Sequence, residues 1–144
     1  NLATLLRTGE AVGIDGVVIP ERRSAGITPA VVNASAGAVE HLRVAVVTNL
    51  GRAVDDLREQ GYWAIALEPG PQAQSLFVAP LPRPLLLMVG SEGRGLSPIL
   101  ARRADVQVMI PMFGRVASLN AAVAGSIALY EIVRRELVAN TGTG

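Results

Sequence analysis

The stretch that decides the fold is Ile110–Glu131, IPMFGRVASLNAAVAGSIALYE, taken together with Leu87–Ser97, LMVGSEGRGLS. Each begins as a short apolar strand, passes into a loop that contains glycine, and then enters a helix, at Ser118 in the first and at Ser97-Pro98 in the second. An apolar strand that ends in such a loop before a helix N-terminus is the usual way in which an α/β protein builds a ligand site. Because the two units begin only about twenty residues apart, their loops can converge on one pocket.

The glycines of the earlier loop do not form a known phosphate cradle. Gly90, Gly93 and Gly95 lack the G-x-G-x-x-G spacing, and no Gly-Lys-Ser/Thr sequence follows them. We therefore expect that the ligand is not held mainly through a pyrophosphate group.

Helices and strands alternate along the rest of the chain. Apolar periodicity, glycine stops and proline starts predict helices at Leu2–Val12, Thr28–Ser35, Leu50–Gln60, Pro98–Arg103 and Ser118–Val138. Apolar runs predict strands at Gly16–Ile19, Leu42–Val47, Tyr62–Leu67, Leu85–Val89 and Val106–Ile110, with Leu76–Val78 as a short run inside a long loop. Strands separated by helices predict an α/β fold with a parallel sheet covered by helices on both faces. We expect one domain over residues 1–138 and a flexible tail over residues 139–144.

The composition excludes several classes of site and partner. The chain has no cysteine and a single histidine, His41, so thiolate catalysis and disulfides are excluded and we expect no metal site. No apolar run reaches the roughly 18 residues of a membrane span, and no signal-peptide pattern opens the chain, so we expect a cytoplasmic protein with no membrane partner. The net charge of +1 provides no global field for attracting nucleic acid.

The apolar content and the last helix point to an interface between subunits. Half of the residues are apolar and 17% are charged, which is a low charged fraction for a small soluble monomer. Small residues surround most of the first half of the last helix, at Ala121, Ala122, Ala124, Gly125, Ser126 and Ala128. Because small side chains let backbones approach closely, we expect this helix to be packed tightly on several sides.

Three motifs, in this order, resemble the SpoU family of RNA ribose 2′-O-methyltransferases. NLATLLR at Asn1–Arg7 resembles the first motif of the family, VGSEGRGLS at Val89–Ser97 the second, and IPMFGRVASLN at Ile110–Asn120 the third. Two further stretches, RSAGIT at Arg23–Thr28 and SAGA at Ser35–Ala38, are similar to the branch that modifies a guanosine in large-subunit (23S) ribosomal RNA.

The resemblance implies a homodimeric enzyme that uses S-adenosylmethionine on RNA, with a deep C-terminal trefoil knot. Members of the family carry a strand and an Asp-Pro pair just before the first-motif asparagine, whereas this chain begins at that residue, Asn1. Because losing a buried strand would expose a large apolar face, we expect such residues to precede Asn1 in the intact domain. The RNA-recruiting N-terminal domain that is common in this branch would precede it as well.

By motif position, the resemblance places the cofactor against backbone groups of Gly90, Ile110 and Leu119, with Met112 nearby. A neutral adenine suits such a site, because backbone N–H and C=O groups can read its edge without a charged side chain.

The same resemblance implies a catalytic set made of Asn1, Arg7, Glu92, Ser118 and Asn120. A guanidinium is a poor general base because it stays protonated, so we expect Arg7 to hold the RNA phosphate or ribose and to polarise the hydroxyl. Glu92 is the carboxylate that would act as base or orienting group, while Ser118 and Asn120 would fix the ribose or the loop.

Structural alternatives exist for these residues and for the function. Arg7 can be an exposed helix residue, Glu92 a loop carboxylate, Ser118 the N-cap of the last helix, and Asn120 a partner of buried backbone groups. The alternative functions are a transfer RNA ribose 2′-O-methyltransferase and a non-catalytic RNA-binding or assembly module of the same fold. A Rossmann-type nucleotide-binding protein is disfavoured because its glycine pattern is missing.

Overall fold

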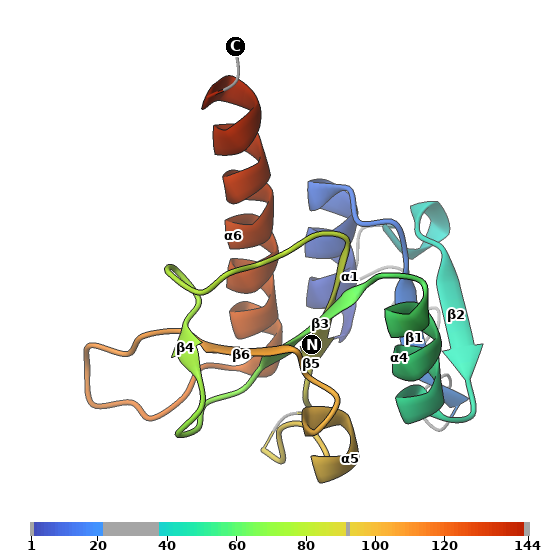
Figure 1. Ribbon diagram of the computed structural model, residues 1–144, viewed down its shortest axis with the longest axis horizontal. Helices are drawn as coiled ribbons and strands as arrows, with labels where there is room; N and C mark the ends of the chain where they lie inside the picture. The colour runs from blue at the N-terminus through green and yellow to red at the C-terminus, as the bar shows by residue number, and fades with distance from the viewer. Residues whose placement is uncertain (1, 22–37, 92, 143–144) are drawn as a thin grey trace. The chain divides into compact units, whose positions relative to one another are not determined.

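The computed structural model describes residues 2–21, 38–91 and 93–142 (Figure 1). The expected helix Thr28–Ser35 lies outside these residues, as do the stretch Arg23–Thr28 and most of Ser35–Ala38. The chain divides into two compact units, the first made of residues 1–48 with 125–144 and the second of residues 49–124.

In its described residues, the first unit contains two helices, two short strands and a 3₁₀ turn. These elements are α1 (Leu2–Val12), β1 (Val17–Pro20), η1 (Ala38–His41), β2 (Val44–Val47) and most of α6 (Ala121–Gly142). The strands β1 and β2 pair in parallel, with Val17 opposite Val44.

Helix α1 ends in a Schellman motif, in which two backbone hydrogen bonds close the last turn. Gly13 has a left-handed φ of 76°. Its N–H donates to the carbonyl of Glu10 at 3.0 Å, and the N–H of Ile14 donates to the carbonyl of Gly9 at 3.1 Å. These bonds satisfy carbonyls that the end of a helix leaves without partners. The expected helix and its stop at Gly13 are confirmed.

Helix α6 begins in the second unit and continues through the first. Its small residues Ala122, Gly125 and Ala128 are buried, and their spacing of three places them on one side of the helix. The hydroxyl of Ser126 donates to Oγ1 of Thr8 in α1 at 2.9 Å. The first half of the helix is therefore packed tightly along one side and not on several sides as expected, because Val123 and Tyr130 are exposed, as are residues 136–140.

The second unit contains a sheet of four parallel strands in the order β4-β6-β3-β5. Its elements are α4 (Leu50–Glu59), β3 (Trp63–Leu67), β4 (Gln74–Ser75), β5 (Leu85–Val89), α5 (Pro98–Ala101) and β6 (Val106–Met109). The expected α/β fold with parallel strands is confirmed, although the described strands form two sheets and not one.

Both α4 and α5 begin with a side-chain cap. Oδ1 of Asn49 accepts the N–H of Arg52 at 3.1 Å at the start of α4. Oγ of Ser97 accepts the N–H of Leu100 at 3.3 Å at the start of α5, where Pro98 occupies the first helical position. Each cap satisfies an N–H that has no partner within its helix.

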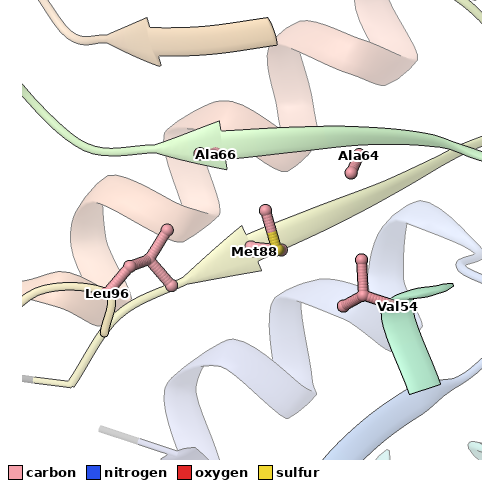
Figure 2. Close-up of a cluster of buried hydrophobic side chains, with 5 residues drawn as sticks. All are labelled: Val54, Ala64, Ala66, Met88 and Leu96. Carbon is pink, nitrogen blue, oxygen red and sulfur yellow. The ribbon is translucent and has the colours of Figure 1, made fainter. Parts of the chain in front are cut away.

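A cluster of small and medium side chains packs α4 and the loop after β5 against one face of the sheet (Figure 2). Its members are Val54, Ala64, Ala66, Met88 and Leu96. Between the two alanines, Ile65 points to the opposite face of β3 and is also fully buried. Burial of successive residues shows that β3 is covered on both faces, as expected for a strand inside a parallel sheet.

The segment between β3 and β5 differs from the sequence-based expectation. The strand residues are Gln74 and Ser75, which pair with β6, and not Leu76–Val78. After Ser75 the chain turns, because its carbonyl accepts the N–H of Val78 at 3.1 Å and that of Ala79 at 2.9 Å. The apolar side chain of Leu76 is buried beside this turn, and this burial, not membership of a strand, accounts for the apolar residue at this position.

Within the described ranges, no helix combines the length and the apolar character needed to cross a bilayer. The same residues contain no group of three or more histidine, aspartate or glutamate side chains that could hold a metal ion.

Glu131 is a buried carboxylate on α6 that is held by two arginines of the next turn. Nε and Nη2 of Arg134 donate to its two oxygens at 2.7 and 2.9 Å, and Nε of Arg135 donates at 2.9 Å. The hydrogen bonds from Arg134, together with those from Arg135, outweigh the burial of the carboxylate and lower the pKa of Glu131 from 4.5 to about 2.

Acid should therefore destabilise the protein through Glu131. Because the pKa is lower in the folded state, the stabilisation is complete above pH 4.5 and is lost as the pH falls through about 2. Thermal unfolding followed by circular dichroism across this window measures the loss. The variant Glu131→Gln should have a lower Tm near neutral pH and a flatter decline in acid. An equally steep decline in the variant would show that other groups control acid unfolding.

Candidate active site

The carboxyl ends of three neighbouring strands lie at one edge of the four-stranded sheet. Leu67, the last residue of β3, is opposite Val89 of β5 on one side and Val108 of β6 on the other. Because the strands are parallel and about 4.8 Å apart, the segments that follow them emerge side by side. Gly90 and Ile110 therefore leave the sheet on the two sides of β3.

The loop after β5, which carries the second motif, folds tightly onto itself. The N–H of Gly95 donates to the carbonyl of Ser91 at 3.0 Å. A Cβ on Gly90 would overlap the backbone of Gly95 and lie 2.5 Å from the nitrogen of Leu96. Only glycine fits at position 90, because backbone atoms cannot move aside as a flexible side chain can.

Glu68, the first residue after β3, contacts this loop through its side chain. Its Oε1 accepts the N–H of Leu96 at 3.0 Å. Gly95 has a φ of 68°, and the position that a Cβ would take there is filled by the same carboxylate oxygen. None of the sequence motifs points to Glu68. The available signal was a carboxylate directly after an apolar strand, at the edge where ligands bind in α/β sheets.

The loop after β6, which carries the third motif, projects from the sheet (Figure 1), and most of its residues are exposed. Ile110 and Met112 are half-buried beside the sheet, whereas residues 113–120 are exposed. Phe113 is 94% exposed, and Leu119 is 38% exposed. The loop thus presents apolar side chains and backbone groups next to the end of β6.

Asn120, and not Ser118, caps α6. Oδ1 of Asn120 accepts the N–H of Ala122 at 2.9 Å and that of Val123 at 3.2 Å. The helix accordingly starts at Ala121, three residues later than expected, and it runs to Gly142, past the expected end at Val138. Asparagine and serine are equally good N-cap residues, so intrinsic preference does not explain why the helix begins after Asn120 and not after Ser118. Ser118 is exposed in the loop.

The structure brings only part of the expected set together. Gly90 and Ile110 lie at one edge of one sheet. Arg7 belongs to the first unit, where it is exposed on α1. Asn1 and Glu92 lie outside the described residues.

An open hollow of about 530 Å³ lies at the opposite, amino edge of the sheet. Some of its polar side chains form hydrogen bonds within the fold. Its lining residues are Asp55, Arg58, Glu59, Gly61, Tyr62, Trp63 and Asp105. Nη2 of Arg58 donates to Asp105 at 2.7 Å, and the N–H of Ala64 donates to the other oxygen at 2.7 Å. The hydrogen bond from Arg58 holds the pKa of Asp105 below its usual value. These groups join α4 to the strands, and they lie away from the motif loops.

Comparison with known proteins agrees with this arrangement. The sequence profile of the SpoU rRNA methylase family matches residues 1–130. A candidate TrmH family tRNA/rRNA methyltransferase of Staphylococcus haemolyticus is 44% identical over 135 residues, which are 94% of this chain and 54% of that protein.

Two solved structures have the same fold. The SpoU methyltransferase AviRb of Streptomyces viridochromogenes, solved with the cofactor AdoMet, has a TM-score of 0.85 at 27% identity and matches over 95% of this chain and 56% of that one. An RNA 2′-O ribose methyltransferase has a TM-score of 0.81 at 30% identity, over 94% of this chain and 52% of that one.

The chain spans about half the length of these relatives. The family match includes the loops that follow β5 and β6, which the parallel register brings to one edge of the sheet. The chain therefore belongs to the SpoU rRNA methylase family.

Proposed function

We propose that this protein transfers a methyl group from S-adenosylmethionine to a ribose 2′-hydroxyl of RNA. The observation that carries the proposal is the emergence of the second-motif and third-motif loops on the two sides of β3. The related structures support it, since one holds AdoMet and another is an RNA 2′-O ribose methyltransferase.

The residues at this edge fit S-adenosylmethionine. The cofactor has no pyrophosphate, and the loops have no phosphate-cradle spacing. Backbone groups of Gly90, Ile110 and Leu119 would read the adenine, and the thioether of Met112 would pack beside it. When bound, S-adenosylmethionine supplies an electrophilic methyl group on a sulfonium.

Arg7 would act on the RNA and not on the cofactor. It is exposed on α1, and its guanidinium can form two parallel hydrogen bonds to a phosphate. Such a contact would align the 2′-oxygen in line with the methyl group, and alignment alone can lower a barrier by several kcal/mol. Glu92 would accept the hydroxyl proton or orient the hydroxyl.

The remaining motif residues would shape the site. Because Oδ1 of Asn120 caps α6, this residue would act by fixing where the third-motif loop joins the helix. Ser118 is free of that role and would contact the ribose. Asn1, which precedes α1 in the sequence, would complete the set.

The substrate proposed first is a guanosine in 23S ribosomal RNA, on the similarity of Arg23–Thr28 and Ser35–Ala38 to that branch of the family. A transfer RNA substrate is the second candidate, because the Staphylococcus haemolyticus relative carries both RNAs in its name. The trefoil knot stays a prediction from the resemblance. If the protein transfers no methyl group, that result would support the alternative function of a non-catalytic RNA-binding module.

We also propose that the protein forms a homodimer through α6 and α1. Tyr130 and Leu137 are 55% and 60% exposed, and their spacing of seven places them on one face of α6. Val123, one further heptad earlier, is 46% exposed. An exposed apolar stripe of this kind is typical of an interface.

Replacing Arg7 by alanine should abolish methyl transfer and leave cofactor binding intact. Loss of one positioning contact typically lowers a rate by about a hundred- to a thousandfold. Arg7→Lys should restore little, because an ammonium cannot reproduce the bidentate contact. Single-turnover methylation of a ribosomal RNA fragment, with calorimetric titration of S-adenosylmethionine, measures both quantities. Arg52→Ala, an exposed arginine on α4, is the matched control. Loss of cofactor binding in Arg7→Ala would contradict the assignment.

Gly90→Ala should weaken cofactor binding by about tenfold or more, because a Cβ there would displace the backbone of the second-motif loop. Gly114→Ala is the control, since a Cβ at that position of the third-motif loop meets no atom within 4 Å. Calorimetry on both variants, with circular dichroism to verify folding, makes the comparison. Equal affinity in the two variants would place the cofactor away from Gly90.

Light scattering at micromolar concentration should give the mass of a dimer, and Leu137→Arg should shift it to that of a monomer. A buried, unpaired guanidinium in the interface would be costly. Ile99→Arg is the control, because Ile99 is similarly exposed but lies on α5. A monomer mass for the unmodified protein would contradict the dimer.

A further inference from the structure

Glu68 occupies a position between the two motif loops that no other carboxylate of the described second unit shares. It directly follows β3, the strand that lies between β5 and β6. Its backbone N–H continues the ladder by donating to the carbonyl of Val108 at 2.9 Å. The residue is half-buried.

The backbone of Glu68 is fixed from the β6 side. In addition to the ladder bond, Nε2 of Gln107 donates to the carbonyl of Glu68 at 3.0 Å. The same amide lies 3.4 Å from the carbonyl of Pro69. These bonds place the start of the Glu68 side chain at a set position relative to β6.

The side chain of Glu68 reaches the opposite way, to the loop after β5. Its Oε1 accepts the N–H of Leu96 at 3.0 Å and fills the space beside Gly95 where a Cβ would lie. A hydrogen bond from a backbone N–H to a carboxylate is stronger than one between neutral groups, and partial burial strengthens it further. Glu68 thus joins β6 to the second-motif loop through one residue.

We propose that Glu68 is a positioning residue that sets the second-motif loop relative to the third-motif loop and so preorganises the cofactor site. The inference rests on the proposed function for the identity of the ligand. Binding sites lose affinity when their supporting contacts leave a loop about 1 Å too loose, because the ligand must then order the loop itself. Glu68 has no contact with the reacting atoms in this role.

The length and charge of the side chain make distinct contributions. Glutamine keeps the length and an oxygen that can accept the N–H of Leu96, but it lacks the charge. Alanine removes the acceptor altogether and leaves the N–H without this partner. Affinity for S-adenosylmethionine should therefore fall in the order Glu68, Glu68→Gln, Glu68→Ala.

Two measurements on the purified protein test the proposal. Hydrogen exchange of the Leu96 amide, without cofactor, reports the loop contact, and calorimetric titration with S-adenosylmethionine reports the site. In Glu68→Ala we expect faster exchange at Leu96 and an about ten- to hundredfold higher Kd, since hydrogen bonds to charged groups contribute free energies of this size. Glu68→Gln should be intermediate in both. Glu59→Gln, an exposed carboxylate at the amino edge of the sheet, should change neither.

The outcomes separate this proposal from the proposed function. Faster exchange at Leu96 with an unchanged Kd would overturn the positioning role while leaving the cofactor site in place. Unmodified protein that binds no S-adenosylmethionine at millimolar concentration would overturn the proposed function, whatever the exchange at Leu96. If Glu68→Ala fails to fold, Glu68→Gln decides alone: a Kd equal to that of the unmodified protein would overturn the role, and a raised Kd with an unchanged Tm would support it.

Discussion

The parallel register of β5, β3 and β6 is the constraint on which the rest of the site depends. Leu67 lies opposite both Val89 and Val108, so the chain leaves the three strands at one edge. A slip of one residue in either pairing would move a loop by about 3.3 Å and would turn the buried side chains of that strand to the opposite face. The unequal side chains on the two faces of β3 oppose such a slip, because it would move the larger Ile65 to the face that Ala64 and Ala66 occupy, and all three are almost completely buried. The same strand register therefore determines both the packing of the core and the positions of the loops.

Glycine and one carboxylate then give the second-motif loop its shape. Gly90 leaves room for the backbone of Gly95, and Gly95 leaves room for Glu68. The result is a loop whose path is dictated by contacts between backbone atoms, which suits the recognition of a neutral ligand by backbone groups. The third-motif loop is built differently. It is exposed from residue 113 onward, and its later end is anchored where Asn120 caps α6.

Local sequence signals predicted much of this arrangement. The stop of α1 at Gly13, the cap of α5 at Ser97 and the strand Leu85–Val89 each depend on a few adjacent residues, and each was predicted correctly. The predictions were wrong or incomplete where contacts with residues distant in the sequence determine the structure. Ser75 belongs to a strand only because β6 lies beside it, and Glu68 matters only because Leu96 folds back over it. At α6, two neighbouring residues could each cap the helix, and the asparagine is the one that does so. The spacing of the two motif loops showed only that they can converge on one pocket. The resemblance to the family is what assigned both loops to one cofactor site.

Under the proposed function, this edge of the sheet serves methyl transfer to a ribose oxygen. The most direct measurement is incubation of the protein with ribosomal RNA and S-adenosylmethionine whose methyl group carries a heavy isotope, followed by digestion to nucleosides and mass spectrometry. We expect the heavy methyl group on the ribose of a single kind of nucleoside, with guanosine expected first. A heavy methyl group on a base, or none on any nucleoside when the cofactor is bound, would contradict it.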